Sequence, residues 1–178
     1  TFDSKEEIYV YWALTSLQKS GVIKKFIVKC QTEQIISQVF YTYQRNKKII
    51  QGKLLESLNY TPDFIIYFNN KHGDIEKYIY KIYNGSKNFM PIGSKKRPAF
   101  IVINNQLKSY IDVKGGYSKF GDLKGFSVKQ KIIYNRTGIY VQKIIPADLF
   151  KRIGVPDRYL YTDSGIRLRK IKPELFKQ

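Results

Sequence analysis

The chain has 178 residues, 43% of them hydrophobic, which suits one domain with a hydrophobic core and excludes a disordered polar chain. Lys and Arg total 32 against 14 Asp and Glu, and the net charge of +18 favours a polyanionic partner such as nucleic acid, with compositional drift as the alternative. The single Cys30 and the single His72 exclude an intrachain disulfide, paired-cysteine zinc motifs and histidine-rich metal centres, so any chemistry must come from carboxylates, lysines and hydroxyls.

The first third of the chain predicts one helix followed by strands. Asp3 and Ser4 are candidates for the helix N-cap, and apolar residues then recur with helical spacing as far as Gly21. Strands are expected at 25–31, 35–43 and 64–68. The stretch 49–58 fits either a helix or an extended chain.

The remainder of the chain predicts a β meander followed by alternating helices and strands. The meander strands are expected at 77–83, 99–104 and 107–113, and four glycines predict a loop over 115–125. A helix at 126–134, a strand at 139–145, a helix at 147–153 and a basic C-terminal tail complete the chain. This order predicts an α/β fold with a central mixed β-sheet flanked by helices, an extra β meander and the basic tail.

Two short strings place acidic residues in or beside apolar strands, where a charge is costly unless it is paired or binds a metal. One is Thr-Pro-Asp-Phe-Ile-Ile with Asp63, and the other is Tyr-Ile-Asp-Val-Lys-Gly with Asp112 and Lys114. Residues two apart in a strand share a face, so Asp112 and Lys114 project together and converge with Asp63 if it opens a neighbouring strand. Mg²⁺ prefers carboxylate oxygens, and a metal held in this way can activate a water for attack on a phosphate.

Each of these residues also has an ordinary structural alternative. Asp63 follows a proline, as many turn aspartates do. Asp112 and Lys114 could form a solvent-facing pair on a half-exposed strand. Their joint occurrence in a strongly basic chain favours the catalytic interpretation.

The pair Pro62-Asp63 followed by Asp112-Val113-Lys114 resembles the motif of the PD-(D/E)XK nuclease superfamily, whose members are restriction-endonuclease-like. Gly115 after the lysine, an acidic first helix and the element order over 126–145 add to the resemblance. It covers residues 2–146 and is strongest to small phage endonucleases, junction-resolving enzymes among them, and to transposon-encoded nucleases.

The resemblance implies a nuclease domain over 1–150 and a basic extension over 151–178 that packs on it or trails from it. The implied activity is that of a Mg²⁺-dependent deoxyribonuclease, with Mn²⁺ as a substitute. The implied catalytic residues are Glu7, Asp63, Asp112 and Lys114, and the implied metal ligands are Asp63, Asp112, Glu7 and Val113.

Within the first helix, Glu7 borders the apolar stripe and is preferred as the acidic ligand, with Glu6 as the alternative. A third interpretation is that Ser4-x-x-Glu7 is only a capping box. The 49 positions from Asp63 to Asp112 depart from the short hairpin usual in the superfamily and predict additional strands between them. If Asp74 or Glu76 were the true partner of Asp112, Asp63 would be structural.

DNA contacts are expected from basic residues after the motif and in the tail. The candidates are Lys129, Lys131, Arg158, Arg167, Arg169 and Lys170. No helix-turn-helix or zinc-finger pattern is present, so recognition of DNA shape is expected rather than of base sequence. A homodimer is expected because cutting both strands usually requires two active sites.

The sequence therefore predicts a metal-dependent DNA endonuclease of phage or mobile-element DNA processing, with branched and linear substrates both open. The alternative is a non-catalytic nucleic-acid-binding module on a nuclease fold, although a pure binder has no use for carboxylates that repel phosphate. No apolar run approaches the ~20 residues of a membrane helix and no signal-peptide pattern is visible. We therefore expect no membrane partner and a cytoplasmic location, in the host cell if the protein is phage-encoded.

Overall fold

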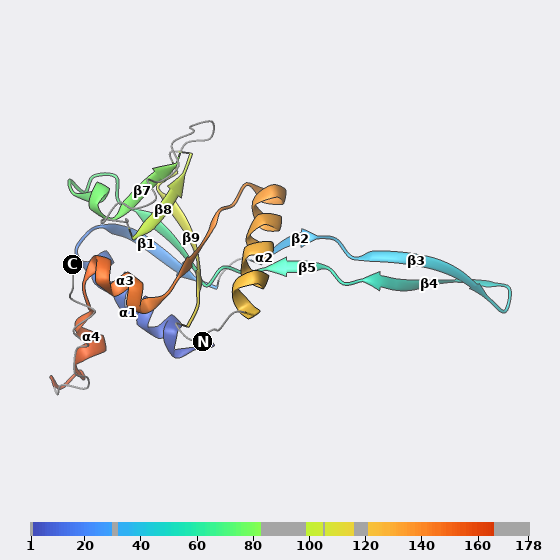
Figure 1. The fold of residues 1–178 in the computed structure, drawn as a ribbon, viewed down its shortest axis with the longest axis horizontal. Coiled ribbons are helices and arrows are strands. Elements are labelled where there is room, and N and C mark those ends of the chain that lie inside the picture. Colours follow the sequence, from blue (N-terminus) through green and yellow to red (C-terminus); the bar gives the residue numbers. More distant parts are fainter. Residues whose placement is uncertain (1, 30–31, 83–98, 105, 116–120, 166–178) are drawn as a thin grey trace.

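The computed structural model describes residues 2–29, 32–82, 99–104, 106–115 and 121–165 (Figure 1). The described elements are, in chain order, α1 (Lys5–Lys19), β1 (Ile23–Val28), β2 (Glu33–Ile36), β3 (Val39–Arg45), β4 (Lys48–Leu55), β5 (Leu58–Tyr60), β6 (Phe64–Phe68), the 3₁₀ turn η1 (Ile75–Lys77), β7 (Ile79–Ile82), β8 (Phe100–Ile103), β9 (Lys108–Val113), α2 (Gly121–Thr137), β10 (Val141–Ile144), α3 (Pro146–Ile153) and α4 (Asp157–Leu160).

A four-stranded mixed sheet forms the centre of the molecule, in the order β1-β6-β9-β10. Strand β6 runs antiparallel to both β1 and β9, and β10 runs parallel to β9. The predicted α/β class with a central mixed sheet is confirmed. The crossover from β9 to β10 is made through α2, as parallel neighbours require.

The two faces of this sheet pack against different helices. Ile111 and Val113 of β9 belong to a core cluster with Leu14 of α1 and Phe150 of α3. Tyr110, on the opposite face of the same strand, packs with a second cluster formed by α2, β2, β5 and β10. Asp112 shares the face of Tyr110 by strand alternation, so it lies on the α2 side.

The first helix begins and ends as predicted. Ser4 is its N-cap and accepts a hydrogen bond from the Glu7 N–H at 3.2 Å, which satisfies one of the free N–H groups of the first turn. Gly21 follows the helix with φ of +83°, a left-handed conformation that glycine adopts without steric cost. Val10, Leu14 and Leu17 form its buried stripe.

The predicted meander is wrong, because β7 and β8 pair in parallel. A buried side chain attaches this pair to the central sheet. The Gln142 carboxamide of β10 accepts a hydrogen bond from Ile101 N–H at 2.8 Å and donates one to the Ala99 carbonyl at 2.9 Å. The side chain thus takes the place of a neighbouring strand's backbone, an arrangement that strand propensity cannot reveal.

Several predicted boundaries also differ from the structure. The expected strand 35–43 is divided between β2 and β3, and the ambiguous stretch 49–58 is extended, with β4 as its main part. Strands β3 and β4 form a long hairpin that projects away from the body beyond β2 and β5 (Figure 1). The expected loop over 115–125 is too long, because α2 already begins at Gly121.

The described part of the C-terminal region packs on the body. The Tyr159 ring of α4 lies 4.9 Å from Tyr9 of α1 and 5.0 Å from Phe150 of α3, measured between ring centroids. The proposed domain boundary at residue 150 falls inside α3 and stays a prediction. None of the described helices has the length and apolar character needed to cross a membrane.

Candidate active site

The register of the central sheet brings Asp63 and Asp112 together. Phe64 of β6 pairs with Ile111 of β9, and continuing this register by one residue places Asp63 opposite Asp112. Directly opposed residues of an antiparallel pair have Cβ atoms about 5 Å apart. The Asp63 side chain also reaches across to β9, where its Oδ2 accepts a hydrogen bond from Val113 N–H at 2.7 Å.

The environment of Asp63 disfavours its negative charge. The pKa of this carboxyl is raised to about 6, first by burial and then by the nearby charges of Asp112 and Glu7, which together outweigh the lowering effect of the Val113 N–H. A proton or a cation between the two carboxyl groups would relieve this repulsion. The pair therefore has the character of a cation site.

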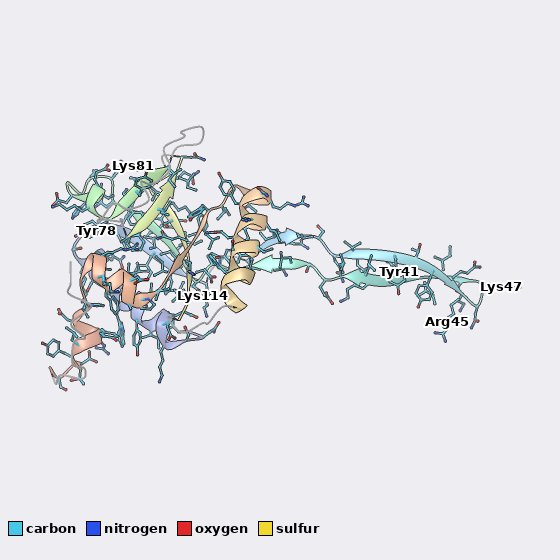
Figure 2. The ribbon with its side chains drawn as sticks, in the orientation of Figure 1. Tyr41, Arg45, Lys47, Tyr78, Lys81 and Lys114 are labelled. Carbon is cyan, nitrogen blue, oxygen red and sulfur yellow. The ribbon has the colours of Figure 1, made fainter. Side chains whose placement is uncertain are left out.

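Lys114 lies beside the second carboxylate. Its Nζ is 3.1 Å from Asp112 Oδ2, and the Lys114 side chain is 33% exposed while that of Asp112 is 12% exposed. The Lys114 backbone N–H donates to the Ile144 carbonyl at 2.9 Å, which extends the β9–β10 ladder past the end of β9. The ammonium is thereby held next to the carboxylate while its side chain remains partly open to solvent. Figure 2 shows Lys114 in the body of the molecule, near the base of α2.

Glu7 is buried at the N-terminal end of α1 and has two functions in the structure. It reaches back over the start of the helix, where its Oε2 accepts from the backbone N–H of Asp3, the residue before the N-cap, at 3.2 Å. It also forms an ion pair with Lys29, whose Nζ is 2.9 Å from Glu7 Oε2 and 2.6 Å from Asp3 Oδ2. Its charge still acts on Asp63. The capping interpretation is correct for its backbone contacts, and a catalytic contribution stays a prediction.

Glu6 approaches the same end of β9 from the neighbouring position of the helix. Its Oε1 lies 3.5 Å from the point that a Cβ atom on Gly115 would occupy. A side chain at position 115 would therefore touch the Glu6 carboxylate. Both candidate helix carboxylates face the motif, Glu6 toward its glycine and Glu7 toward Asp63, so the choice between them stays open.

Lys29 is a site residue that sequence reasoning missed. It follows β1 in a left-handed conformation with φ of +42°, and its backbone N–H donates to the Asp63 carbonyl at 3.1 Å. Burial acts to lower the pKa of Lys29, but hydrogen bonds with Asp3 and Glu7 outweigh it and raise the pKa above its usual value. Lys29 thus joins the backbone of one motif residue to the helix carboxylate. In the sequence, Lys29 is one of several lysines in an alternating strand, and nothing there indicates its contacts with Glu7 and Asp63.

Tyr60 is the second missed residue, three positions before Asp63. It is only 4% exposed, and its hydroxyl has no hydrogen-bond partner within the described residues. Burial raises its pKa, as do the negative charges of Asp112 and Asp63, so the hydroxyl is a neutral donor near both carboxylates. The Lys129 Nζ of α2 lies 5.0 Å from the centroid of the Tyr60 ring. The sequence presented Tyr60 only as the start of a turn.

The Asp63–Asp112 pair fits a hard divalent cation. Mg²⁺ is held in proteins by one or two carboxylates, with water and substrate phosphate completing its coordination. Among the described residues, no three His, Cys, Asp or Glu side chains form a group that could hold a metal. Glu7 is therefore not part of a ready-made three-carboxylate cluster with Asp63 and Asp112. The role of Val113 as a ligand stays a prediction, with its N–H already bound to Asp63.

The other predicted residues are distributed over the molecule. Lys129 and Lys131 lie on α2, whose Gln130 fixes it to β10 by donating to the Val141 carbonyl. Arg158 of α4 forms an ion pair with Asp163, on the side of the body away from the β3–β4 hairpin (Figure 1). The remaining candidates lie outside the described residues, namely Arg167, Arg169 and Lys170.

The alternative acidic residues are engaged elsewhere. Asp74 Oδ2 is 2.9 Å from Lys77 Nζ, and Glu76 Oε1 is 2.6 Å from Lys81 Nζ, both as exposed ion pairs around η1. This geometry favours Asp63 as the partner of Asp112. No protein-family model, curated protein or solved structure matches this chain. The functional argument therefore rests on the residues and their geometry.

Proposed function

We propose that this chain is a metal-dependent DNA endonuclease that hydrolyses phosphodiester bonds at the Asp63–Asp112 pair. The single observation that carries the proposal is the meeting of these two carboxyl groups, placed opposite each other by the β6–β9 register, at one end of the central sheet. Lys114 stands 3.1 Å from Asp112 in the same place. The net charge of +18 supports a phosphate-bearing substrate.

Asp63 and Asp112 would hold a Mg²⁺ ion, with Mn²⁺ as its substitute. When bound, such an ion polarises the scissile phosphate and lowers the pKa of a coordinated water. The chain's part is to fix the ligands: the Val113 N–H orients the Asp63 carboxylate, and the β6–β9 register sets its separation from Asp112. This orientation is in place before substrate arrives, which spares reorganisation during the reaction.

Lys114 is the group we assign to the reacting phosphate. Its ammonium can stabilise the negative charge that develops on the phosphate oxygens, or hold the attacking water for in-line displacement. The ion pair with Asp112 positions this ammonium. Lys129 of α2 lies over the ring of Tyr60. It can neutralise a phosphate next to the one that is cut.

The competing function is a nucleic-acid-binding module without catalysis. Such a module gains nothing from two carboxylates that repel each other and repel phosphate. The pKa of Asp63 is raised first by burial and then by neighbouring charges, so its charged form is unfavourable near neutral pH. A cost of this kind is typical of functional sites. It favours catalysis over simple binding.

Incubation with supercoiled plasmid tests the proposal. We expect nicking or linearisation with Mg²⁺ or Mn²⁺, none with EDTA, and none from an Asp112→Ala variant. Asp74→Ala is the matched control. Asp74 is an exposed aspartate that pairs with Lys77, and it follows β6 in the chain, whereas Asp63 precedes that strand. Absence of cleavage on both plasmid and a four-way junction, with tight salt-sensitive binding, would favour the binding module. A preference for the junction would support selectivity for branched DNA.

Sedimentation of the protein with and without DNA tests the proposed homodimer. Two active sites in one assembly would linearise plasmid without accumulating nicked circles. A monomer would nick first and linearise later.

A further inference from the structure

The hairpin of β3 and β4, residues 39–55, is here called the arm. Its two strands form a separate two-stranded sheet and pair only with each other among the described strands. Every residue of β3 is exposed, and so are most of β4. An isolated two-stranded hairpin is only marginally stable in water. Ile49 is 81% exposed and Phe40 is 50% exposed, so the arm presents apolar side chains to solvent that a binding partner would bury.

The charge of the arm favours one kind of partner. Residues 39–55 contain Arg45, Lys47, Lys48 and Lys53 and no Asp or Glu. Three of these cations lie at the tip, where Arg45 pairs directly across from Lys48 (Figure 2). Like charges opposed in a sheet are destabilising, so this rung is unfavourable until an anion lies against it. A polyanion would supply that anion.

The turn keeps the tip narrow. Asn46 and Lys47 both have positive φ, of 49° and 60°, which is the conformation of a two-residue type I′ turn. This turn matches the twist of the strands and closes the ribbon without splaying it. The tip therefore presents its cations at the end of a ribbon only two strands wide.

The faces of the arm differ in chemistry. Tyr41 and Tyr43 stack on one face with ring centroids 5.7 Å apart, and a Cβ atom at Gly52 would lie 2.6 Å from the Tyr41 ring. Glycine is therefore needed there for the ring to lie flat on the ribbon. The opposite face carries Thr42 and Gln51 as a cross-strand pair. Their hydroxyl and amide groups can donate to and accept from base edges.

These dimensions and groups suit one ligand. The major groove of B-form DNA admits a two-stranded β-ribbon, whereas the major groove of A-form RNA is too narrow for side chains to enter. Eight residues of β4 span roughly 26 Å, more than the depth of the groove. A second copy of this chain fits less well, because its arm carries the same cations and its body shares the net charge of +18.

We propose that the arm is a DNA-docking element that enters the major groove of a B-form duplex and sets its tip cations on phosphates. This contact lies away from the carboxylate pair (Figure 1). It is a binding surface in addition to the proposed nuclease site and does not depend on cleavage. A nuclease so equipped would hold flanking duplex while the carboxylate pair at the end of β6 and β9 reaches the scissile bond.

The test measures binding of a linear duplex in EDTA, with all proteins carrying Asp112→Asn so that cleavage plays no part. The arm variant is Arg45→Gln/Lys48→Gln, which leaves the turn residues unchanged. The control is Lys24→Gln/Lys71→Gln, which removes the same charge from exposed positions on the body. We expect the arm variant to bind about tenfold more weakly and to lower the salt slope by about 2, and the control to do neither.

Protection of guanine N7 from methylation locates the groove. The parent protein should protect this major-groove atom, and the arm variant should lose the protection. Equal weakening by both double variants would overturn the proposal, because net charge alone would then explain binding. Unchanged DNA affinity together with loss of self-association in sedimentation would overturn it in favour of an arm that joins two copies. Circular dichroism of both variants verifies that they fold.

Discussion

The Asp63 carboxylate accepts a hydrogen bond from the backbone N–H of Val113 at 2.7 Å. This bond joins the residue before β6 to the strand that carries Asp112, and it fixes the carboxylate of one motif against the backbone of the other. A turn aspartate with only a capping role would bond to its own turn. Asp63 therefore does more than cap its own turn, and its catalytic role stays a prediction.

The pH dependence of stability follows from the raised pKa of Asp63. Since its pKa is about 6 in the folded chain against 3.8 ordinarily, the folded state holds more protons than the unfolded state between these values. Its contribution to stability is therefore fully present below about pH 4 and is lost as the pH rises through 6.

Asp63→Asn should remove this loss. We expect the variant to be more stable than the parent at pH 7.5 in EDTA, by urea denaturation, because Asn keeps an oxygen for the Val113 N–H and carries no charge. Asp74→Asn should show no such gain, since contact with Lys77 lowers the pKa of Asp74 instead. A less stable Asp63→Asn at pH 7.5 would contradict the electrostatic account.

Divalent metal should stabilise the folded chain through the same pair. Ligand that binds only the folded state raises stability by about 2.7 kcal/mol at a concentration of 100 Kd. We expect Mg²⁺ to raise the thermal midpoint at pH 7.5, to raise it less at pH 5 where Asp63 holds its proton, and to have no effect on Asp63→Asn. Equal shifts in the parent and the variant would place the metal elsewhere.

Lys114 should act on the chemical step more than on binding. Replacing it by Met removes the ammonium 3.1 Å from Asp112 while keeping much of the side chain's length. We expect the single-turnover rate to fall about 100-fold, which corresponds to about 2.7 kcal/mol, with less than a threefold change in DNA affinity. Lys71→Met, at an exposed turn position, serves as the control. A loss confined to affinity would make Lys114 an ordinary phosphate contact.

The Tyr60 hydroxyl should matter for activity and not for folding. Removing a buried hydroxyl that has no partner among the described groups leaves no protein group unpaired, so Tyr60→Phe should be at least as stable as the parent. If the hydroxyl donates to a water or phosphate oxygen held near Asp63, the cleavage rate should fall about tenfold. Full activity in Tyr60→Phe would assign the residue to packing alone. Tyr140→Phe is a control, because Tyr140 is a partly buried tyrosine whose pKa is raised by burial without the charges of Asp63 and Asp112.

Local patterns predicted the parts of this molecule that depend on nearby residues. The capping box and Gly21 delimited α1, and the apolar run after Pro62 gave β6 with its observed bounds. The motif residues were recognisable because a carboxylate in an apolar strand is conspicuous in any sequence. Their nearness in space, however, depends on the β6–β9 register, which spans residues far apart in the chain.

The features that sequence reasoning missed all depend on contacts between distant segments. Lys29 is defined by its contacts with α1 and Asp63, and Tyr60 by charges from β9. The attachment of the β7–β8 pair to the central sheet rests on Gln142, which is 41 residues from its partner Ile101 along the chain. The separation of the arm from the body likewise follows from where β2 and β5 pair. Strand propensity predicts where each strand lies in the sequence, but it does not predict which other strand it pairs with.

The most direct test of the central claim is the single-turnover cleavage rate on fully bound DNA with saturating Mg²⁺, measured for Asp63→Asn, Asp112→Asn and the control Asp74→Asn. Full binding separates chemistry from affinity. The account predicts that both motif variants lose at least about 100-fold in rate while still binding DNA, and that the control cleaves as the parent does. Cleavage that persists in both motif variants would contradict the assignment of Asp63 and Asp112 as the catalytic pair.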